Sequence, residues 1–133
     1  MIAADTNLIA YLLLEGEHTS LAEQVLERDS HWIAPLLWRS EFRNVLALYV
    51  RQDLLSPEHA LSFMELGEML MGGREYVLTS DSVLGLATSS GCSAYDCEFV
   101  ALAQQEEVSV VTSDRRVLDA FTDVAVDPRR FVS

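Results

Sequence analysis

Short apolar runs alternate with longer segments of helical periodicity along almost the whole chain of 133 residues. Buried strands are expected in residues 1–4, 32–34, 75–78, 108–112 and 124–126, and the fourth of these is the clearest. Strands that alternate with helical segments are typical of a parallel sheet joined by crossover helices. The sequence therefore predicts an α/β fold.

The segments between these runs carry the signals of helices. Helices are expected over residues 8–14, 19–28, 35–52, 56–71, 81–90, 93–107 and 115–121. The start at Ser56-Pro57-Glu58 is the clearest, because a capping side chain, a proline at the first helical position and an acid in the first turn coincide there. No linker, repeat or low-complexity segment separates the elements, so residues 1–133 are expected to form a single domain.

The charge of the chain is strongly negative, and its cations are all arginine. Nine arginines face 21 carboxylates, which gives a formal net charge of −12 at pH 7. Proteins that bind nucleic acid by general attraction to phosphate are normally basic, so a nucleic-acid role here must use a few placed arginines and bound cations. The absence of lysine excludes a P-loop or a Schiff-base mechanism.

The two cysteines and the apolar segments bear on where the protein acts. Cys92 and Cys97 lack the spacing of metal ligands, which favours two reduced thiols in a cytosolic protein. No basic segment precedes an apolar stretch at the start of the chain, and no run approaches the roughly 18 apolar residues of a membrane span. A cytoplasmic protein without a membrane role is therefore expected.

Two aspartates directly follow predicted strands. Asp5 ends the first strand and Asp114 follows the strand at 108–112. In an open parallel α/β sheet, ligands bind at the carboxyl ends of the strands, where both residues would lie. Aspartate in this position is also a common helix N-cap, and for either residue alone the cap is the preferred interpretation.

Glu41 is placed on the apolar side of a predicted helix. It shares a stripe with Leu37, Trp38, Val45 and Leu48, opposite Arg39 and Arg43. A carboxylate that points toward the core would cost several kcal/mol without a partner. The pattern therefore indicates either an ion or a buried arginine beside Glu41.

Asp96 repeats this pattern on a later helix. It shares a face with Phe99, Val100 and Ala103, whereas Glu98 and Gln105 are expected to face the other way. Ser93 and Asp96 have the spacing of a capping box, which is an equally good explanation of Asp96 taken alone.

If the four carboxylates converge, a metal site becomes a better explanation than separate helix caps. Two carboxylates 4 Å apart repel by about 4 kcal/mol at an effective dielectric constant near 20, so a fold would keep such a cluster only with a cation in it. A donor set made only of oxygen favours Mg²⁺ or Mn²⁺ over zinc.

Four short motifs at these acids resemble those of the PIN-domain ribonucleases, and among these the VapC-type toxins of toxin-antitoxin pairs. The resemblance is in the order and spacing of the motifs and covers nearly the whole chain. The motifs are Asp5-Thr6-Asn7, Ser40-Glu41, the segment YDCEFVALA at 95–103 and the segment VTSDRRVL at 111–118. The resemblance implies a three-layer α/β/α fold with a parallel sheet of about five strands. It also implies an endoribonuclease dependent on Mg²⁺ or Mn²⁺, a homodimer, and an antitoxin that restrains it.

The resemblance also implies roles for individual residues. Asp5 and Asp96 would be the surest metal ligands, Glu41 and Asp114 would complete the catalytic acidic site, and Asn7 and Thr112 would support it. Candidate contacts to RNA are Arg115 and Arg116, which follow Asp114, together with Arg39 and Arg43.

Two other classes of function remain open from the sequence. An aspartate-based phosphatase or phosphoacceptor domain also places aspartates at strand ends, but it normally needs a lysine-type cation, and Asp5-x-Asn7 lacks the second aspartate of the phosphatase motif. A PIN-like module that binds RNA or protein without cleaving it is the other alternative. His18, His31 and His59 lie outside the acidic motifs, which disfavours a metal-free ribonuclease built on a histidine pair.

Overall fold

A computed structural model describes all residues from 1 to 133 and contains one parallel sheet of five strands. The strands are β1 (Ile2–Ala4), β2 (Trp32–Pro35), β3 (Glu75–Tyr76), β4 (Val110–Val111) and β5 (Ala125–Val126). Their order in the sheet is β3-β2-β1-β4-β5, and every neighbouring pair is parallel. The predicted α/β fold with a parallel sheet of about five strands is confirmed.

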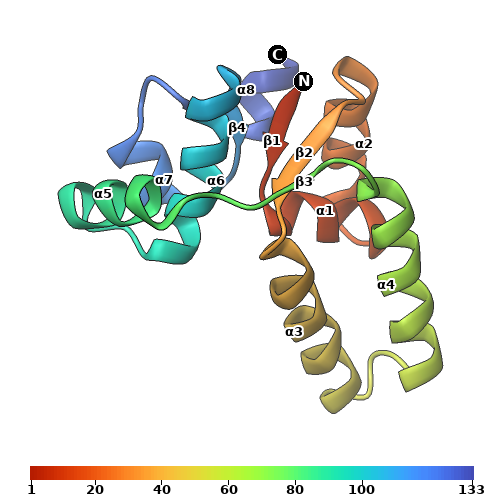
Figure 1. Ribbon diagram of the computed structural model, residues 1–133. Helices are drawn as coiled ribbons and strands as arrows, with labels where there is room; N and C mark the ends of the chain where they lie inside the picture. The colour runs from red at the N-terminus through yellow and green to blue at the C-terminus, as the bar shows by residue number, and fades with distance from the viewer.

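Eight helices connect and cover the strands (Figure 1). They are α1 (Thr6–Leu13), α2 (Thr19–Arg28), α3 (Trp38–Arg51), α4 (Pro57–Met71), α5 (Ser80–Ser90), α6 (Ala94–Glu106), α7 (Arg115–Ala120) and α8 (Pro128–Val132). Helix α6 packs on β1, β2 and β4 and carries α5 on its outer side. Helices α1, α2 and α4 cover the other face, which completes the three predicted layers.

The centre of the sheet is fully buried, as a parallel sheet between two helical layers requires. Every residue of β1 and β2 is buried, and the side chain of Trp32 is 0% exposed. Because successive strands run in the same direction, the carboxyl ends of β1, β2 and β4 lie at one edge. Figure 1 shows α1 and α3 beginning at this edge, so residues that follow the strands are brought to the same place.

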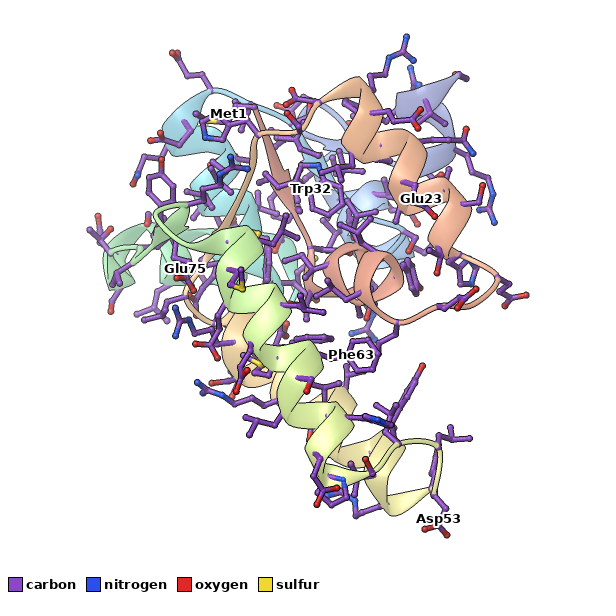
Figure 2. The ribbon with its side chains drawn as sticks, turned by 90° about the vertical axis from the view of Figure 1, so that its right-hand side faces the viewer. Met1, Glu23, Trp32, Asp53, Phe63 and Glu75 are labelled. Carbon is purple, nitrogen blue, oxygen red and sulfur yellow. The ribbon has the colours of Figure 1, made fainter.

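Helices α3 and α4 form an antiparallel hairpin that extends beyond the sheet. Figure 2 shows Asp53 at the tip of this hairpin, far from Trp32 in the middle of the molecule. At the base of the hairpin the indole of Trp38 is fully buried, and it packs so closely on α4 that a Cβ built on Gly67 would lie 3.0 Å from the ring. This packing fixes α3, and with it Glu41, against the body of the protein.

The predicted helix start at Pro35 is wrong, because Pro35 is the last residue of β2 and α3 begins at Trp38. The amide of Leu36 donates to Tyr76 in β3 and that of Ala34 donates to Arg74 just before β3, so the nitrogen of Pro35 faces β1. The pairing between β1 and β2 has ended at that level, and the proline therefore removes no hydrogen bond from the sheet.

Three other expectations differ from the structure. The strands predicted at 75–78 and 108–112 are shorter, and Val77 is 82% exposed. Helix α8 was not predicted, although Asp127 caps it and Pro128 occupies its first position. Leu48 is exposed rather than inward-facing, because the distal half of α3 lies in the hairpin and has no sheet to pack on.

None of the eight helices is long and apolar enough to cross a membrane.

Candidate active site

The four carboxylates singled out by the sequence line one cavity at the carboxyl edge of the sheet. Asp5 follows β1, Glu41 lies in the first turn of α3, Asp96 lies in the first turn of α6, and Asp114 follows β4. The cavity has a volume of about 450 Å³, and Asn7 and Thr112 also form part of its wall. Segments more than 100 residues apart in the chain therefore supply one acidic site.

Asp5 is held by two hydrogen bonds that leave little freedom to its carboxylate. The amide of Leu8 donates to Oδ1 at 2.8 Å, which makes Asp5 the N-cap of α1. The hydroxyl of Thr112, at the end of β4, donates to Oδ2 at 2.6 Å. The helix cap and the cavity are thus not alternatives for Asp5, since one carboxylate serves both.

Glu41 is oriented in a similar way from the neighbouring helix. The hydroxyl of Thr6 donates to Oε1 of Glu41 at 2.6 Å. Thr6 is itself buried, and the side chain of Glu41 is half-buried. The inward carboxylate of Glu41 is therefore bonded to a threonine hydroxyl, and no arginine is bonded to it.

Asp114 and Asp96 each lie at the start of a helix. Oδ1 of Asp114 accepts from the amide of Arg116 at 2.9 Å, and the amide of Asp114 donates to the hydroxyl of Thr112 at 3.1 Å. The amide of Asp96 donates to the hydroxyl of Ser93 at 3.1 Å, which is one half of a capping box. The return bond from the amide of Ser93 is not made, so the carboxylate of Asp96 is available to the cavity.

Asp5, Glu41 and Asp96 are harder to ionise than carboxylates in water. Burial raises the pKa of Asp5 from 3.8 to about 6, against the hydrogen bonds from Thr112 and Leu8 and with help from the charges of Asp114 and Glu41. Burial is also the main cause that raises the pKa of Glu41 and of Asp96. Such perturbation in a cleft is characteristic of functional sites.

The donor chemistry of the cavity fits a hard divalent cation. All its charged donors are carboxylate oxygens, and hydroxyl and amide oxygens are the other donors nearby. No group of three acidic, histidine or cysteine side chains is arranged to hold one ion. Mg²⁺ commonly binds through one or two carboxylates and keeps several waters, so it does not require a closed protein cage.

The arginines proposed to contact RNA are not equivalent. Arg39 binds Glu75 through Nε at 2.6 Å and Nη2 at 2.8 Å, and it binds Glu68 through Nη1 at 3.1 Å. Its guanidinium is therefore engaged on the far side of α3 from the cavity acids. Arg43, Arg115 and Arg116 are exposed and form no ion pair, and the charge of Arg116 lowers the pKa of Asp96.

Glu98 is a fifth acid, and it lines the hollow that adjoins the acidic cavity rather than the cavity itself. Its side chain is half-buried, and burial together with the charge of Glu41 raises its pKa. Glu98 is half-buried rather than exposed because α6 is packed on nearly all sides, with residues 99–103 buried in succession. Thr6 was also missed as the partner of Glu41, although it stands inside the first acidic motif.

A five-stranded parallel sheet with an acidic cavity at its carboxyl edge defines the structural class of this protein. The PIN domain family matches residues 2–125, and the chain belongs to this family. A comparison with curated protein sequences found no match.

Three solved structures show the same fold at low sequence identity. PAE2754 from Pyrobaculum aerophilum has a TM-score of 0.77 and 18% identity, with 98% of this chain and 92% of that chain covered. FitAcB from Neisseria gonorrhoeae has a TM-score of 0.72 and 21% identity, with 97% and 99% covered. A toxin-antitoxin complex from Klebsiella pneumoniae has a TM-score of 0.69 and 17% identity, with 96% and 98% covered.

Proposed function

We propose that this protein is a metal-dependent endoribonuclease and the toxin of a toxin-antitoxin pair. The observation that carries the proposal is the convergence of Asp5, Glu41, Asp96 and Asp114 on one cavity, with at least two of them fixed by threonine hydroxyls. Membership of the PIN family supports nuclease activity, because PIN domains are generally nucleases. The RNA substrate rests on the resemblance of the four motifs to PIN ribonucleases.

Asp5 and Asp96 would hold the cation, with Glu41 and Asp114 acting directly or through water. The cation, Mg²⁺ or Mn²⁺, would supply activation of water and neutralisation of phosphate charge. Thr112 and Thr6 keep Asp5 and Glu41 in place, so little reorganisation is needed when substrate enters. No histidine forms part of the cavity wall to activate a ribose 2′-hydroxyl, so water is the expected nucleophile and the products would carry 5′-phosphate and 3′-hydroxyl ends.

The antitoxin partner is supported by two observations. One similar structure is a toxin-antitoxin complex from Klebsiella pneumoniae, and another is FitAB bound to a DNA fragment. On this chain the exposed side of α4 carries Leu61, Leu66 and Met69, which are 60%, 49% and 79% exposed. A partner helix with an apolar face would cover these side chains.

A homodimer is the proposed state of the toxin. Leu36, Val77 and Leu84 are exposed and border a hollow that adjoins the acidic cavity, and a second copy of the chain would bury them. Sedimentation of the wild type and of Val77→Asp tests this proposal. A wild type that sediments as a monomer at high concentration would contradict it.

The nuclease proposal is tested by cleavage of RNA with and without metal. The wild type is expected to cleave RNA in Mg²⁺ or Mn²⁺ and to be inactive in EDTA, and Asp96→Asn is expected to abolish cleavage while melting cooperatively. Full cleavage in excess EDTA would contradict the metal mechanism. Binding of RNA without any cleavage in metal would identify a non-cleaving PIN module instead.

A further inference from the structure

Tyr95 is the only exposed aromatic side chain of the protein. Its side chain is 63% exposed, whereas every other phenylalanine, tyrosine and tryptophan is buried or half-buried. It does not pack against the hydrophobic core, and its hydroxyl makes no hydrogen bond within the chain. Nothing in the folding of α6 therefore accounts for an aromatic residue at this position.

The location of Tyr95 points to a role in the site. It is the second residue of α6, directly before Asp96, and it forms part of the wall of the acidic cavity. Because α6 begins at the mouth of the cavity, the ring is presented to solvent beside the carboxylates. A volume of about 450 Å³ lies within the range of roughly 300–1,000 Å³ that holds small ligands, so there is room for a nucleotide rather than for a duplex.

Beside Tyr95 the cavity is lined by both polar and apolar side chains, and no basic residue is among them. Ser40 and Asn44 on α3 and Asn7 on α1 are exposed and line the same cavity. With a net charge of −12, the protein has little general attraction for phosphate. Groups that contact bases, namely an aromatic face and amides, would therefore add binding energy to that of a bound cation and the few exposed arginines.

From this arrangement we infer that Tyr95 is a substrate-binding residue that stacks on one unpaired nucleobase of single-stranded RNA next to the acidic cavity. The inference rests on the proposed function and assigns one base-contacting residue to it. In an A-form duplex the faces of the bases are covered by their neighbours, so an aromatic ring can reach only an unstacked base. Asn44 and Asn7 are placed to bond the edges of the same or an adjacent base.

The test is a cycle that combines two protein variants with a modified RNA. Binding of a fluorescent single-stranded oligonucleotide is measured by anisotropy in Ca²⁺, which suits oxygen ligands, after intact length of the RNA has been checked. Tyr95→Ala is expected to weaken binding about 5- to 150-fold, which corresponds to about 1–3 kcal/mol for one stacked base. Tyr95→Phe keeps the ring and is expected to bind within about twofold of the wild type.

The modified RNA separates stacking from a structural effect. Removal of one base, scanned along the oligonucleotide, should at one position weaken the wild type as much as Tyr95→Ala does. At that position Tyr95→Ala should cause no further loss, because the interaction is already absent. The same sequence as a duplex should bind weakly. The salt dependence should be shallow, since each phosphate contact on a single strand adds only about 0.7 to the slope of log Kd against log salt concentration.

Three results would overturn the inference. These are a wild type that binds no single-stranded RNA, a Tyr95→Ala variant that binds like the wild type, and a loss that persists in full on every abasic oligonucleotide. A changed sedimentation coefficient of Tyr95→Ala with unchanged RNA binding would assign the ring to a protein interface. Cleavage by the wild type in Mn²⁺ is scored separately, so failure of the nuclease proposal is distinguishable from failure of stacking.

Discussion

The hydroxyl of Thr112 donates a 2.6 Å hydrogen bond to Oδ2 of Asp5, across 107 residues of sequence. The two residues directly follow neighbouring parallel strands, β4 and β1, and the bond exists because those strands pair in register at Ala3–Val110 and Ala4–Val111. Thr112 is 2% exposed, so the bond is shielded from water. The geometry of the acidic cavity is therefore set by the sheet itself.

Asp5→Asn should stabilise the metal-free protein near neutral pH. The pKa of Asp5 is raised from 3.8 to about 6 in the fold, so between these pH values the folded state holds a proton that the unfolded state has lost. Stability therefore falls as pH rises through this window, and above it the ionised Asp5 costs the fold roughly 3 kcal/mol. Asparagine carries no charge and caps helices as well as aspartate does.

The measurement is denaturant unfolding of the two proteins in EDTA at pH 7.5 and at pH 4. The variant should be the more stable at pH 7.5, and the difference should nearly vanish at pH 4. A variant that is no more stable than the wild type at pH 7.5 would contradict an energetic cost of the ionised Asp5.

Thr112→Val should destabilise the protein and raise the pKa of Asp5 further. The substitution removes the hydroxyl that donates to Asp5 and that accepts from the amide of Asp114 at 3.1 Å. Loss of partners for groups away from water costs about 1–3 kcal/mol. Carboxyl NMR titration of Asp5 reports the pKa, and Thr112→Ser, which keeps the hydroxyl, is the control. An unchanged pKa of Asp5 in Thr112→Val would contradict the positioning role.

Divalent metal should stabilise the wild type and have little effect on Asp5→Asn. A ligand that binds only the folded state adds about 2.7 kcal/mol at one hundred times its Kd, and metal would also relieve the repulsion among the cavity acids. Thermal melts across a titration of Mn²⁺ measure this, with Asp81→Asn as a control, because Asp81 is an exposed acid on α5 outside the cavity. Equal stabilisation of all three proteins would show that the ion binds elsewhere.

The acidic site was predictable because its members occupy positions that the sequence marks. Asp5 and Asp114 directly follow apolar runs. The apolar periodicity around Glu41 and Asp96 predicts that these two side chains face the core. The structure brings all four to one cavity. The partial burial of Glu98 was not predictable in the same way, because α6 packs on both the sheet and α5, and a helix buried on several sides has no single polar face.

The role of Arg39 depends on contacts that no local pattern encodes. The helical periodicity correctly places it opposite Glu41, but its partners Glu75 and Glu68 come from β3 and α4. The sequence cannot show which of several exposed-face arginines meets such partners, since the crossing of α3 with α4 decides it. For the same reason Pro35 was assigned to a helix, because the level at which β1 stops pairing is a property of the sheet.

Arg39→Met should lower stability, whereas Arg43→Met should not. The guanidinium of Arg39 holds Glu75, which also accepts from the indole of Trp38 at 2.7 Å, and these bonds keep the pKa of Glu75 below its ordinary value. Breaking charge-assisted bonds in this half-buried network costs about 1–3 kcal/mol. Arg43 is exposed and unpaired, so it is the matched control.

The pH dependence of the Arg39 effect has a definite sign. Because the pKa of Glu75 is lowered in the fold, its contribution to stability is present above its ordinary pKa and is lost as pH falls through the folded value. The difference in unfolding free energy between the wild type and Arg39→Met should therefore shrink in acid. If the difference in unfolding free energy stays constant as pH falls to the folded-state pKa of Glu75, the effect comes from packing of the arginine stem rather than from its charge.

Two glycines in helices should respond to alanine in opposite directions. In α4, a Cβ on Gly67 would lie 3.0 and 3.1 Å from ring atoms of Trp38 and 3.3 Å from Leu13, and the ring is fully buried and cannot withdraw. Overpacking of this kind costs about 1–3 kcal/mol, against a gain of about 1 kcal/mol in helix propensity. In α5, a Cβ on Gly85 would meet nothing within 4 Å, so the gain stands alone. Gly85→Ala should raise the melting temperature and Gly67→Ala should lower it, and a stabilised Gly67→Ala would show that the packing of α3 on α4 is looser than the structure requires.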